Sequence, residues 1–168
     1  MEIVSTSLSV IRTDIIFKMA HINELIDYTI EVFIVHKNKV LLVYHSSLKK
    51  WLPVGGHIEL DEDPEEALFR ETKEETGLDI EILGNKLDLR TDTFKSLFTP
   101  SYLDIHKINE THRHVGMVYF AKALTDKVVL EEDEHDEIRW FSKSELIDPN
   151  YNLLQDVKVY AEKSLSLE

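Results

Sequence analysis

The chain has 168 residues, of which 43% are hydrophobic and 30% charged, and its formal net charge is −13. This length and composition fit one globular domain that buries its own core. The sequence contains no cysteine, which excludes disulfides, thiolate metal sites and cysteine nucleophiles. The negative charge argues against a nucleic-acid duplex as a partner, whereas a small anion screened by metal ions is compatible with it.

The first residues of the chain lack the basic and then apolar order of a signal peptide. No apolar run in the sequence approaches the ~18 residues that a membrane-spanning helix needs. We therefore expect a cytoplasmic protein that has no membrane partner.

Residues 1–27 are expected to form a helical N-terminal extension. Apolar side chains recur in it at spacings of three and four, which is typical of an amphipathic helix. Its apolar face either covers the domain or docks a second subunit, and the sequence leaves both open. These apolar residues are Ile11, Ile15, Ile16, Met19, Ile22 and Ile26.

Two strands are expected next, at residues 29–35 and 40–44, where β-branched and aromatic side chains dominate. The polar residues 36–39 supply the turn between them. A loop then leads to Gly55 and Gly56, and adjacent glycines let the backbone approach a neighbouring group closely.

A helix is predicted from Pro64 to Thr76. Asp63 is a suitable N-cap, proline is favoured at the first helical position, and Glu66 completes a capping-box pattern. Gly77 is a natural helix stop, because glycine readily takes the left-handed conformation that ends many helices.

Beyond this helix the pattern alternates between strands and helices, which predicts one mixed α/β domain. Residues 85–111 mix polar residues with scattered aromatics and are expected to hold a strand or two and one long loop, and such loops often serve binding. The other expected elements are strands at 80–83, 115–121 and 138–141, an acidic loop at 131–137, a capping-box helix start at Ser142 and a final helix at 150–164.

The helix predicted from Pro64 carries Glu71, Glu74 and Glu75 at positions i, i+3 and i+4, so their carboxylates share one face. Taken alone, such a group is better explained as an ordinary solvated face. A bound divalent cation would offset the repulsion between them, and hard carboxylate oxygens favour magnesium or manganese over zinc or copper. Arg70 stands four residues before Glu74, where its fork of N–H donors can orient the carboxylates.

The surrounding spacing changes this interpretation, because it resembles the Nudix box, the signature of Nudix hydrolases. That signature reads Gly, five residues, Glu, seven residues, Arg-Glu, an apolar residue, any residue, Glu-Glu, any residue, Gly and an apolar residue. Thr72 departs from it, and we expect its methyl group to pack inward at a small cost in stability. Asp61 also differs, since many members have glycine there. The matching residues are Gly56, Glu62, Arg70, Glu71, Glu74, Glu75, Gly77 and Leu78.

The resemblance implies a Nudix hydrolase domain over residues 28–168, with the α/β/α sandwich and mixed sheet of that family. It implies magnesium-dependent hydrolysis of a nucleoside diphosphate linked to another group, with manganese as a substitute ion. The implied partner is a small diphosphate molecule, and a homodimer is an expectation taken from the family alone.

Site roles are carried over from the family by position. Glu74 and Glu75 would bind metal, as would the backbone carbonyl of Gly55. Glu71 would be a further metal ligand or the base that activates water, because family members divide these roles differently. Together with Arg70, these three glutamates form the expected catalytic group.

The resemblance also assigns supporting residues. Glu62 and Arg70 would hold the loop against the helix, and Gly56 and Gly77 would support the loop. A glutamate of the late acidic loop often joins the metal site, and Glu134 is chosen here over its rivals Glu131, Glu132 and Glu137.

Three residues outside the box are candidate substrate contacts: His57, Arg113 and His114. His112 and His114 would share one face of a strand, where a metal pair is conceivable. Because the chain has no cysteine and the sequence shows no other histidine beside them, substrate contact or plain exposure is favoured instead. His57 follows the glycine pair and is equally well explained by contact with phosphate or by structural packing.

An enzyme is therefore the leading function, and a non-catalytic nucleotide-binding sensor on the same fold is the alternative. A sensor would be expected to lose a box glutamate, and none is missing here. An isomerase-like relative that acts on an isoprenoid diphosphate would need a reactive cysteine, which the chain lacks. Nucleoside triphosphates, nucleotide sugars, ADP-ribose and dinucleoside polyphosphates all remain as substrates, and specificity is expected to lie in residues 85–114.

Overall fold

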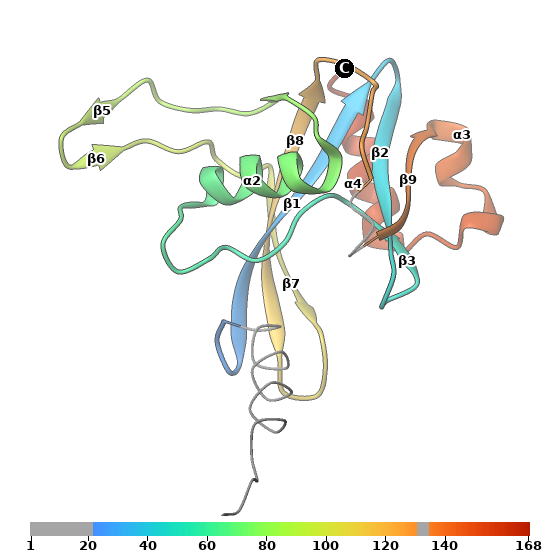
Figure 1. Cartoon of the computed structure of the whole chain (residues 1–168), viewed down its shortest axis with the longest axis horizontal. Helices are drawn as coiled ribbons and strands as arrows, with labels where there is room; N and C mark the ends of the chain where they lie inside the picture. Colours follow the sequence, from blue (N-terminus) through green and yellow to red (C-terminus); the bar gives the residue numbers. More distant parts are fainter. Residues whose placement is uncertain (1–21, 131–134) are drawn as a thin grey trace, which may run out of the picture.

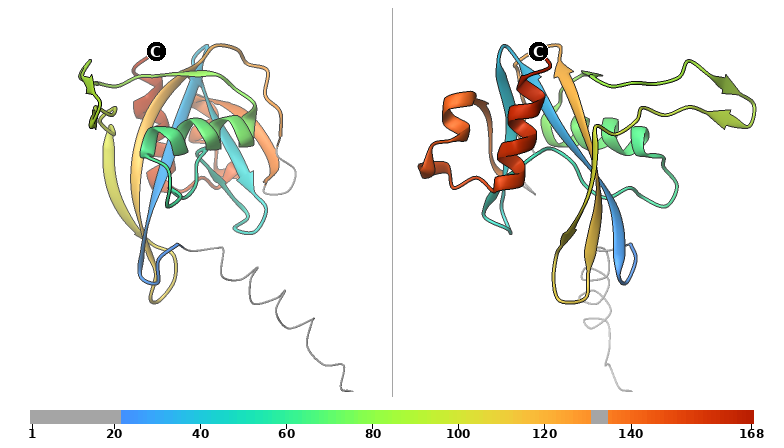
Figure 2. Two further views of the ribbon diagram at one scale, coloured as in Figure 1. Left: turned by 60° about the vertical axis from the view of Figure 1, so that its left-hand side comes forward. Right: turned by 180° about the vertical axis from the view of Figure 1, so that it is seen from behind.

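The computed structural model describes residues 22–130 and 135–168. In chain order the elements are β1 (Ile26–His36), β2 (Lys39–His45), β3 (Lys50–Leu52), α2 (Pro64–Thr76), β4 (Ile80–Ile82), β5 (Arg90–Thr91), β6 (Phe94–Lys95), β7 (Tyr102–Lys107), β8 (Arg113–Ala123), β9 (His135–Ser142), α3 (Lys143–Leu146), the 3-10 helix η1 (Pro149–Tyr151) and α4 (Gln155–Leu165). A mixed sheet lies between α2 and α4 (Figures 1 and 2), which confirms the expected α/β/α sandwich.

The main sheet of the described residues has seven strands. Its central path runs in the order β3-β2-β1-β8-β4, and β9 also pairs with β2 while β7 also pairs with β8. Strands β1 and β8 pair in parallel, with Ile26 opposite Arg113 and Val35 opposite Lys122. This parallel pair forms the middle of the sheet.

The side chains of β1 divide between two core clusters. Ile30, Val32 and Ile34 pack in the cluster that includes residues of α2, whereas Phe33 and Val35 pack in the cluster that includes residues of α4. Alternation along a strand explains this division, because successive side chains point to opposite faces of a sheet. Even-numbered residues of β1 therefore face α2, and odd-numbered residues face α4.

The strands predicted at the start of the domain are confirmed. Strand β1 turns directly into β2 at Lys37 and Asn38, whose φ angles are 50° and 57°. Two consecutive positive φ angles are typical of the tight turn that joins twisted antiparallel strands. The short polar turn thus sets β2 beside β1, and β2 in turn pairs with β3 and β9.

Helix α2 has the predicted bounds, and its ends explain them. The Asp63 carboxylate accepts hydrogen bonds from the backbone N–H groups of Glu65 and Glu66, at 2.9 and 3.1 Å. The Glu66 carboxylate accepts one from the backbone N–H of Asp63, at 2.9 Å, and completes the capping box. Gly77 ends the helix in the left-handed conformation, with φ of 70°.

The region expected to hold a strand or two has three short strands among residues 85–111. Strands β5 and β6 form a separate two-stranded sheet that reaches away from the main sheet (Figures 1 and 2), and β7 joins the edge of β8. The many polar residues of this region explain the short strands, because such residues are depleted in strands.

The prediction of one final helix from Asn150 is wrong at its start. A 3-10 turn spans Pro149–Tyr151, Asn152 takes a left-handed conformation with φ of 46°, and α4 begins only at Gln155. The Asp148 carboxylate accepts from the backbone N–H of Asn150, at 2.9 Å, which favours a separate short turn.

The N-terminal helix expected within residues 1–27 falls mostly on residues outside the described part of the chain. Of the described residues there, Ile26 and Asp27 already belong to β1. None of the described helices is long and apolar enough to cross a membrane.

Thr72 of α2 stands at an apolar position of the Nudix box, and it is fully buried, as expected. Within residues 22–130 and 135–168, its hydroxyl oxygen has no hydrogen-bond partner. A buried hydroxyl in this state costs free energy, and its nearly isosteric replacement by a methyl group removes that cost.

We therefore expect Thr72→Val to raise the free energy of unfolding by about 1 kcal/mol, measured by urea denaturation. The matched control is Thr93→Val in the exposed β5–β6 turn, which should change it by less than about 0.5 kcal/mol. A less stable Thr72→Val protein would show that the hydroxyl contributes favourably where it lies.

Candidate active site

The loop that carries the glycine pair lies against β1 as an irregular neighbouring strand. The backbone N–H of Val32 donates to the carbonyl of Val54, at 2.7 Å, and that of Ile30 donates to the carbonyl of Gly56, at 2.9 Å. Ile58 donates back to the carbonyl of Tyr28, at 3.0 Å. These bonds fix residues 54–58 between β1 and the helix that follows.

Glycine at both positions of the pair lets the loop backbone lie very close to its neighbours. A Cβ atom on Gly56 would lie 2.4 Å from Oε1 of Glu71, and one on Gly55 would lie 2.1 Å from the carbonyl oxygen of Ile30. Gly55 also has a φ of +145°, which residues with side chains rarely adopt. The loop backbone therefore packs directly on the Glu71 carboxylate.

Arg70 ties this loop to α2. Its Nε and Nη2 atoms donate to the two carboxylate oxygens of Glu62, at 3.0 and 2.6 Å. Nη2 also donates to the backbone carbonyl of His57, at 3.1 Å. Nη1 donates to Glu74, at 3.1 Å, and lies 2.8 Å from Oε1 of Glu71. One planar guanidinium thus contacts three carboxylates and the loop backbone.

These contacts shift the acid–base properties of the groups involved. Hydrogen bonding to Glu62 is the largest cause that raises the pKa of Arg70, and contacts with Glu71 and Glu74 add to it. The hydrogen bond from Arg70 in turn lowers the pKa of Glu62. Both groups therefore remain charged at neutral pH, so the link between loop and helix is ionic.

Glu75 is the most buried of the three box glutamates, with a side chain 4% exposed. Its Oε2 atom accepts a hydrogen bond from the backbone N–H of Gly55, at 3.4 Å, and lies 3.3 Å from Nε2 of His135. His135 begins β9, where its ring packs 5.8 Å from that of His45 of β2. The loop, helix α2 and strand β9 therefore meet at Glu75, and β2 contacts this place through His135.

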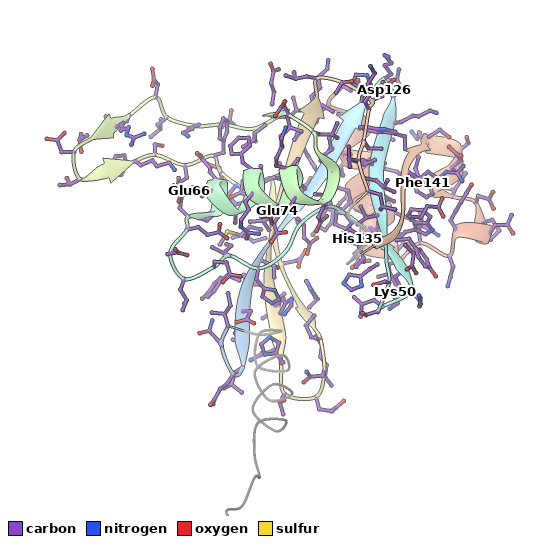
Figure 3. All side chains as sticks on the ribbon, in the orientation of Figure 1. Lys50, Glu66, Glu74, Asp126, His135 and Phe141 are labelled. Atoms are coloured by element: carbon purple, nitrogen blue, oxygen red, sulfur yellow. The ribbon has the colours of Figure 1, made fainter. Side chains whose placement is uncertain are left out.

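Glu74 is placed differently from the other two. Its side chain, labelled on α2 in Figure 3, is 58% exposed, and its Oε2 atom accepts a hydrogen bond from Arg70. Among the described residues, the three box glutamates do not form a group whose oxygens all lie within 4.8 Å of one another. Glu71 and Glu75 thus lie against the loop backbone, whereas Glu74 lies on the solvent-exposed surface of α2.

His135 was not predicted from the sequence, although it directly follows the expected ligand Glu134. Figure 3 labels His135 at the start of β9. Its position after an acidic loop was the available signal. Glu134 and its rivals Glu131 and Glu132 lie outside the described residues. Glu137 is exposed on β9, opposite Tyr44.

The candidate substrate contacts are only partly brought together. His57 and His114 lie with their ring centroids 4.8 Å apart, and His112 lies 5.1 Å from His114. His112 and His114 are buried, which contradicts the expectation of plain exposure. Arg113 lies between them in sequence and is exposed, because alternate residues of a strand point to opposite faces.

Asp27 joins these histidines and was missed by the sequence analysis. Its Oδ2 atom lies 3.3 Å from Nε2 of His112 and 3.4 Å from Nε2 of His57. Burial, followed by the charges of the neighbouring histidines, lowers the pKa of His114 to about 4. We call Asp27, His57, His112 and His114 the histidine cluster.

A second polar group, Glu31, Asp104 and His106, lies next to this cluster. His106 is opposite His114 in the β7–β8 register, with ring centroids 5.5 Å apart. The hydroxyl of Tyr160 donates to Asp104, at 3.1 Å. Burial, then repulsion from Asp104, raises the pKa of Glu31 to about 7.

Comparison with known proteins identifies the family to which the chain belongs. A family model described as the NUDIX domain matches residues 28–162. The chain belongs to the Nudix hydrolase family. No curated protein sequence matches it.

Solved Nudix structures resemble the chain along most of its length. A NUDIX-family hydrolase from Clostridium perfringens is 34% identical and superposes with a TM-score of 0.74, over 87% of this chain and 99% of that one. A MutT NUDIX hydrolase from Burkholderia pseudomallei is 23% identical, with a TM-score of 0.62, over 83% and 98%. The family and the hydrolase from Clostridium perfringens support the assignment of this chain as a Nudix phosphohydrolase, and the second structure shows the same fold.

The contacts of Arg70 lead to a prediction for the stability of the Nudix domain. Arg70→Lys should lower the free energy of unfolding by about 1–3 kcal/mol, because an ammonium group cannot reproduce the forked contact with Glu62 and also reach His57. Urea denaturation measures this change.

Arg90→Lys in β5 is the matched control, since Arg90 is exposed and the chemical change is the same. Its effect should stay below about 0.5 kcal/mol. Equal effects of the two substitutions would contradict a structural role for the Arg70 network.

Proposed function

We propose that this protein hydrolyses a phosphorus–oxygen bond in a small molecule that contains a nucleoside diphosphate, with magnesium as its cofactor. The observation that carries the proposal is the packing of the glycine-pair backbone on Glu71 and Glu75. Membership of the Nudix hydrolase family indicates the class of reaction. The contacts of Glu71 and Glu75 with the loop indicate where in the structure the reaction would take place.

The residues present suit a hard divalent cation. Glu71 and Glu75 bring carboxylate oxygens to the loop backbone at Gly55, and magnesium prefers such oxygen ligands. Glu74 is exposed on the same helix, three residues after Glu71, and would have to turn from Arg70 toward the loop to join them. In this proposal Glu71, Glu74, Glu75, the Gly55 carbonyl and Glu134 hold magnesium, and manganese can replace it.

The bound cation supplies positive charge that neutralises the diphosphate and lowers the pKa of water. The protein supplies position. Arg70 and Glu62 hold the loop against α2, so Glu71 and Glu75 are positioned beside the loop before substrate arrives. Glu71, packed against Gly56, serves as a further ligand or as the base that takes the proton from water.

Fewer residues are indicated as contacts for the substrate than as ligands for the metal ion. The net charge of −13 means that a polyphosphate approaches only where cations screen the repulsion. Arg113 is exposed and lies on the same face of β8 as Tyr119, which packs with α2, so it remains a proposed contact for the substrate. His57 and His114 lie together on the opposite face of the sheet and are not used as substrate contacts in this proposal. Another relative, named UDP-X diphosphatase, is 16% identical with a TM-score of 0.57, which is a likeness of fold alone.

The direct test is turnover of four substrate classes with magnesium: nucleoside triphosphates, nucleotide sugars, ADP-ribose and dinucleoside polyphosphates. Release of phosphate, pyrophosphate or a nucleoside monophosphate is measured. Turnover of one class that stops on adding a chelator supports the proposal. Binding of nucleotides without turnover of any class would favour a non-catalytic sensor.

We expect Glu75→Gln to lower kcat at least about a hundredfold, because the substitution removes a charge from the metal site while keeping the side chain's size. The melting temperature should stay close to that of the unchanged protein. Glu162→Gln on the exposed face of α4 is the matched control, with full activity. Full activity of Glu75→Gln would contradict this assignment.

We also expect Gly56→Ala to lower kcat by a similar factor while the domain still folds. The atoms nearest to the added methyl group would be those of the Glu71 carboxylate group, the first of them at 2.4 Å, so we expect the carboxylate to move and the backbone to stay in place. Gly84→Ala is the control, because the added Cβ atom meets its nearest neighbour at an ordinary 3.5 Å. Unchanged turnover in Gly56→Ala would show that the position of Glu71 is unimportant.

A further inference from the structure

The histidine cluster brings together side chains from three distant parts of the chain. Asp27 lies at the start of β1, His57 follows the glycine pair, and His112 and His114 lie at the start of β8. In the parallel register, Asp27 is directly opposite His114. Asp27, His112 and His114 are all buried, with 9% exposure or less.

The cluster lies on the opposite side of the sheet from the box glutamates. Asp27 is an odd-numbered residue of β1, and His114 is an even-numbered residue of β8. Further along the same strands, Phe33 and Phe120 occupy those faces and belong to the cluster that includes residues of α4. The histidine cluster is therefore separate from the glutamates of α2, and it is not explained by the proposed magnesium site.

Two distances within the cluster match those between neighbouring ligand atoms of a tetrahedral metal ion. Zinc binds histidine nitrogen and carboxylate oxygen at about 2.0–2.2 Å, which places neighbouring ligand atoms roughly 3.3 Å apart. Oδ2 of Asp27 lies 3.3 Å from Nε2 of His112 and 3.4 Å from Nε2 of His57. Asp27, His112 and His114 each offer a ligand atom within 4.8 Å of the others.

The groups around the cluster hold its ligands as they are held in metal sites. The Asp27 carboxylate accepts from the backbone N–H groups of Ile22 and Asn23, at 3.0 and 2.6 Å. Nδ1 of His112 lies 3.2 Å from the carbonyl oxygen of Glu24. Because a carbonyl only accepts, Nδ1 carries the proton, and Nε2 is the atom turned toward Asp27. A second ring nitrogen bonded to a carbonyl is typical of metal-bound histidine.

We propose that Asp27, His112 and His114 bind one zinc-like transition-metal ion, with His57 as the fourth ligand. Three imidazoles and one carboxylate favour zinc over magnesium, because magnesium selects oxygen ligands. The ion would join the start of β1, the start of β8 and the glycine-pair loop. This inference is independent of the proposed hydrolase activity.

The first test is metal binding by the whole protein with excess magnesium present, which occupies the carboxylate site. We expect one zinc ion per chain by elemental analysis after dialysis, and a higher melting temperature with zinc. Cobalt in place of zinc should give the visible absorption of a four-coordinate ion with nitrogen ligands. The absence of stoichiometric zinc and of this cobalt spectrum in the unchanged protein would overturn the proposal.

Variants then locate the ion. His112→Gln, His114→Gln and Asp27→Asn should each weaken zinc binding more than about tenfold, since even outer contacts of a metal site contribute that much. His57→Gln should do the same. His36→Gln, far from the cluster on the β1–β2 hairpin, is the control and should bind zinc normally.

Two further variants separate this site from its neighbours. The double variant Glu71→Gln/Glu75→Gln should lose magnesium-dependent turnover and keep its zinc, which distinguishes a failure of one proposal from a failure of the other. His106→Gln should also keep zinc. Loss of zinc in the double variant would place the ion among the box glutamates. Loss of zinc in His106→Gln would place the ion beside Asp104. Either result would overturn the assignment.

Discussion

The Arg70 guanidinium is the interaction on which the arrangement of the site depends. Glu62, Glu71 and Glu74 bring like charges close together on a chain that is already strongly acidic, and such an arrangement is unfavourable without compensation. Arg70 offsets this repulsion and also binds the carbonyl of His57, so the same group fixes the loop. The Gly56 backbone can then rest on the Glu71 carboxylate, which any side chain at position 56 would push away.

The parts of this site that could be predicted from the sequence are those set by local rules. The ends of α2 follow from Asp63, Glu66 and Gly77, because caps act within a few residues. The contact of Arg70 with Glu74 follows from helical spacing. In the same way, the Lys37–Asn38 turn follows from local chain chemistry. Each of these features needs no knowledge of how distant segments pack.

The parts that could not be predicted depend on pairing between distant segments. Nothing near Asp27 in the sequence indicates that β8 lies beside it, because parallel strands are joined by long connections. His112 and His114 have no further histidine directly next to them in the sequence, whereas the folded chain places His57 and His106 beside His114. His135 reaches Glu75 through the pairing of β9 with β2, which is likewise remote in sequence. The late start of α4 has a different cause, since the left-handed Asn152 interrupts a pattern that otherwise suits a helix.

The loop of residues 54–58 connects the two proposed metal sites. Gly56 packs on Glu71, and the next residue, His57, directs its side chain to Asp27 and its carbonyl to Arg70. A metal ion bound through His57 would restrict the same peptide that Arg70 holds. Binding free energies between two linked sites are reciprocal, so if the zinc-like ion tightens magnesium binding, magnesium must tighten binding of that ion by the same factor. Their different ligands, nitrogen on one face of the sheet and oxygen on the other, allow each ion to be varied alone.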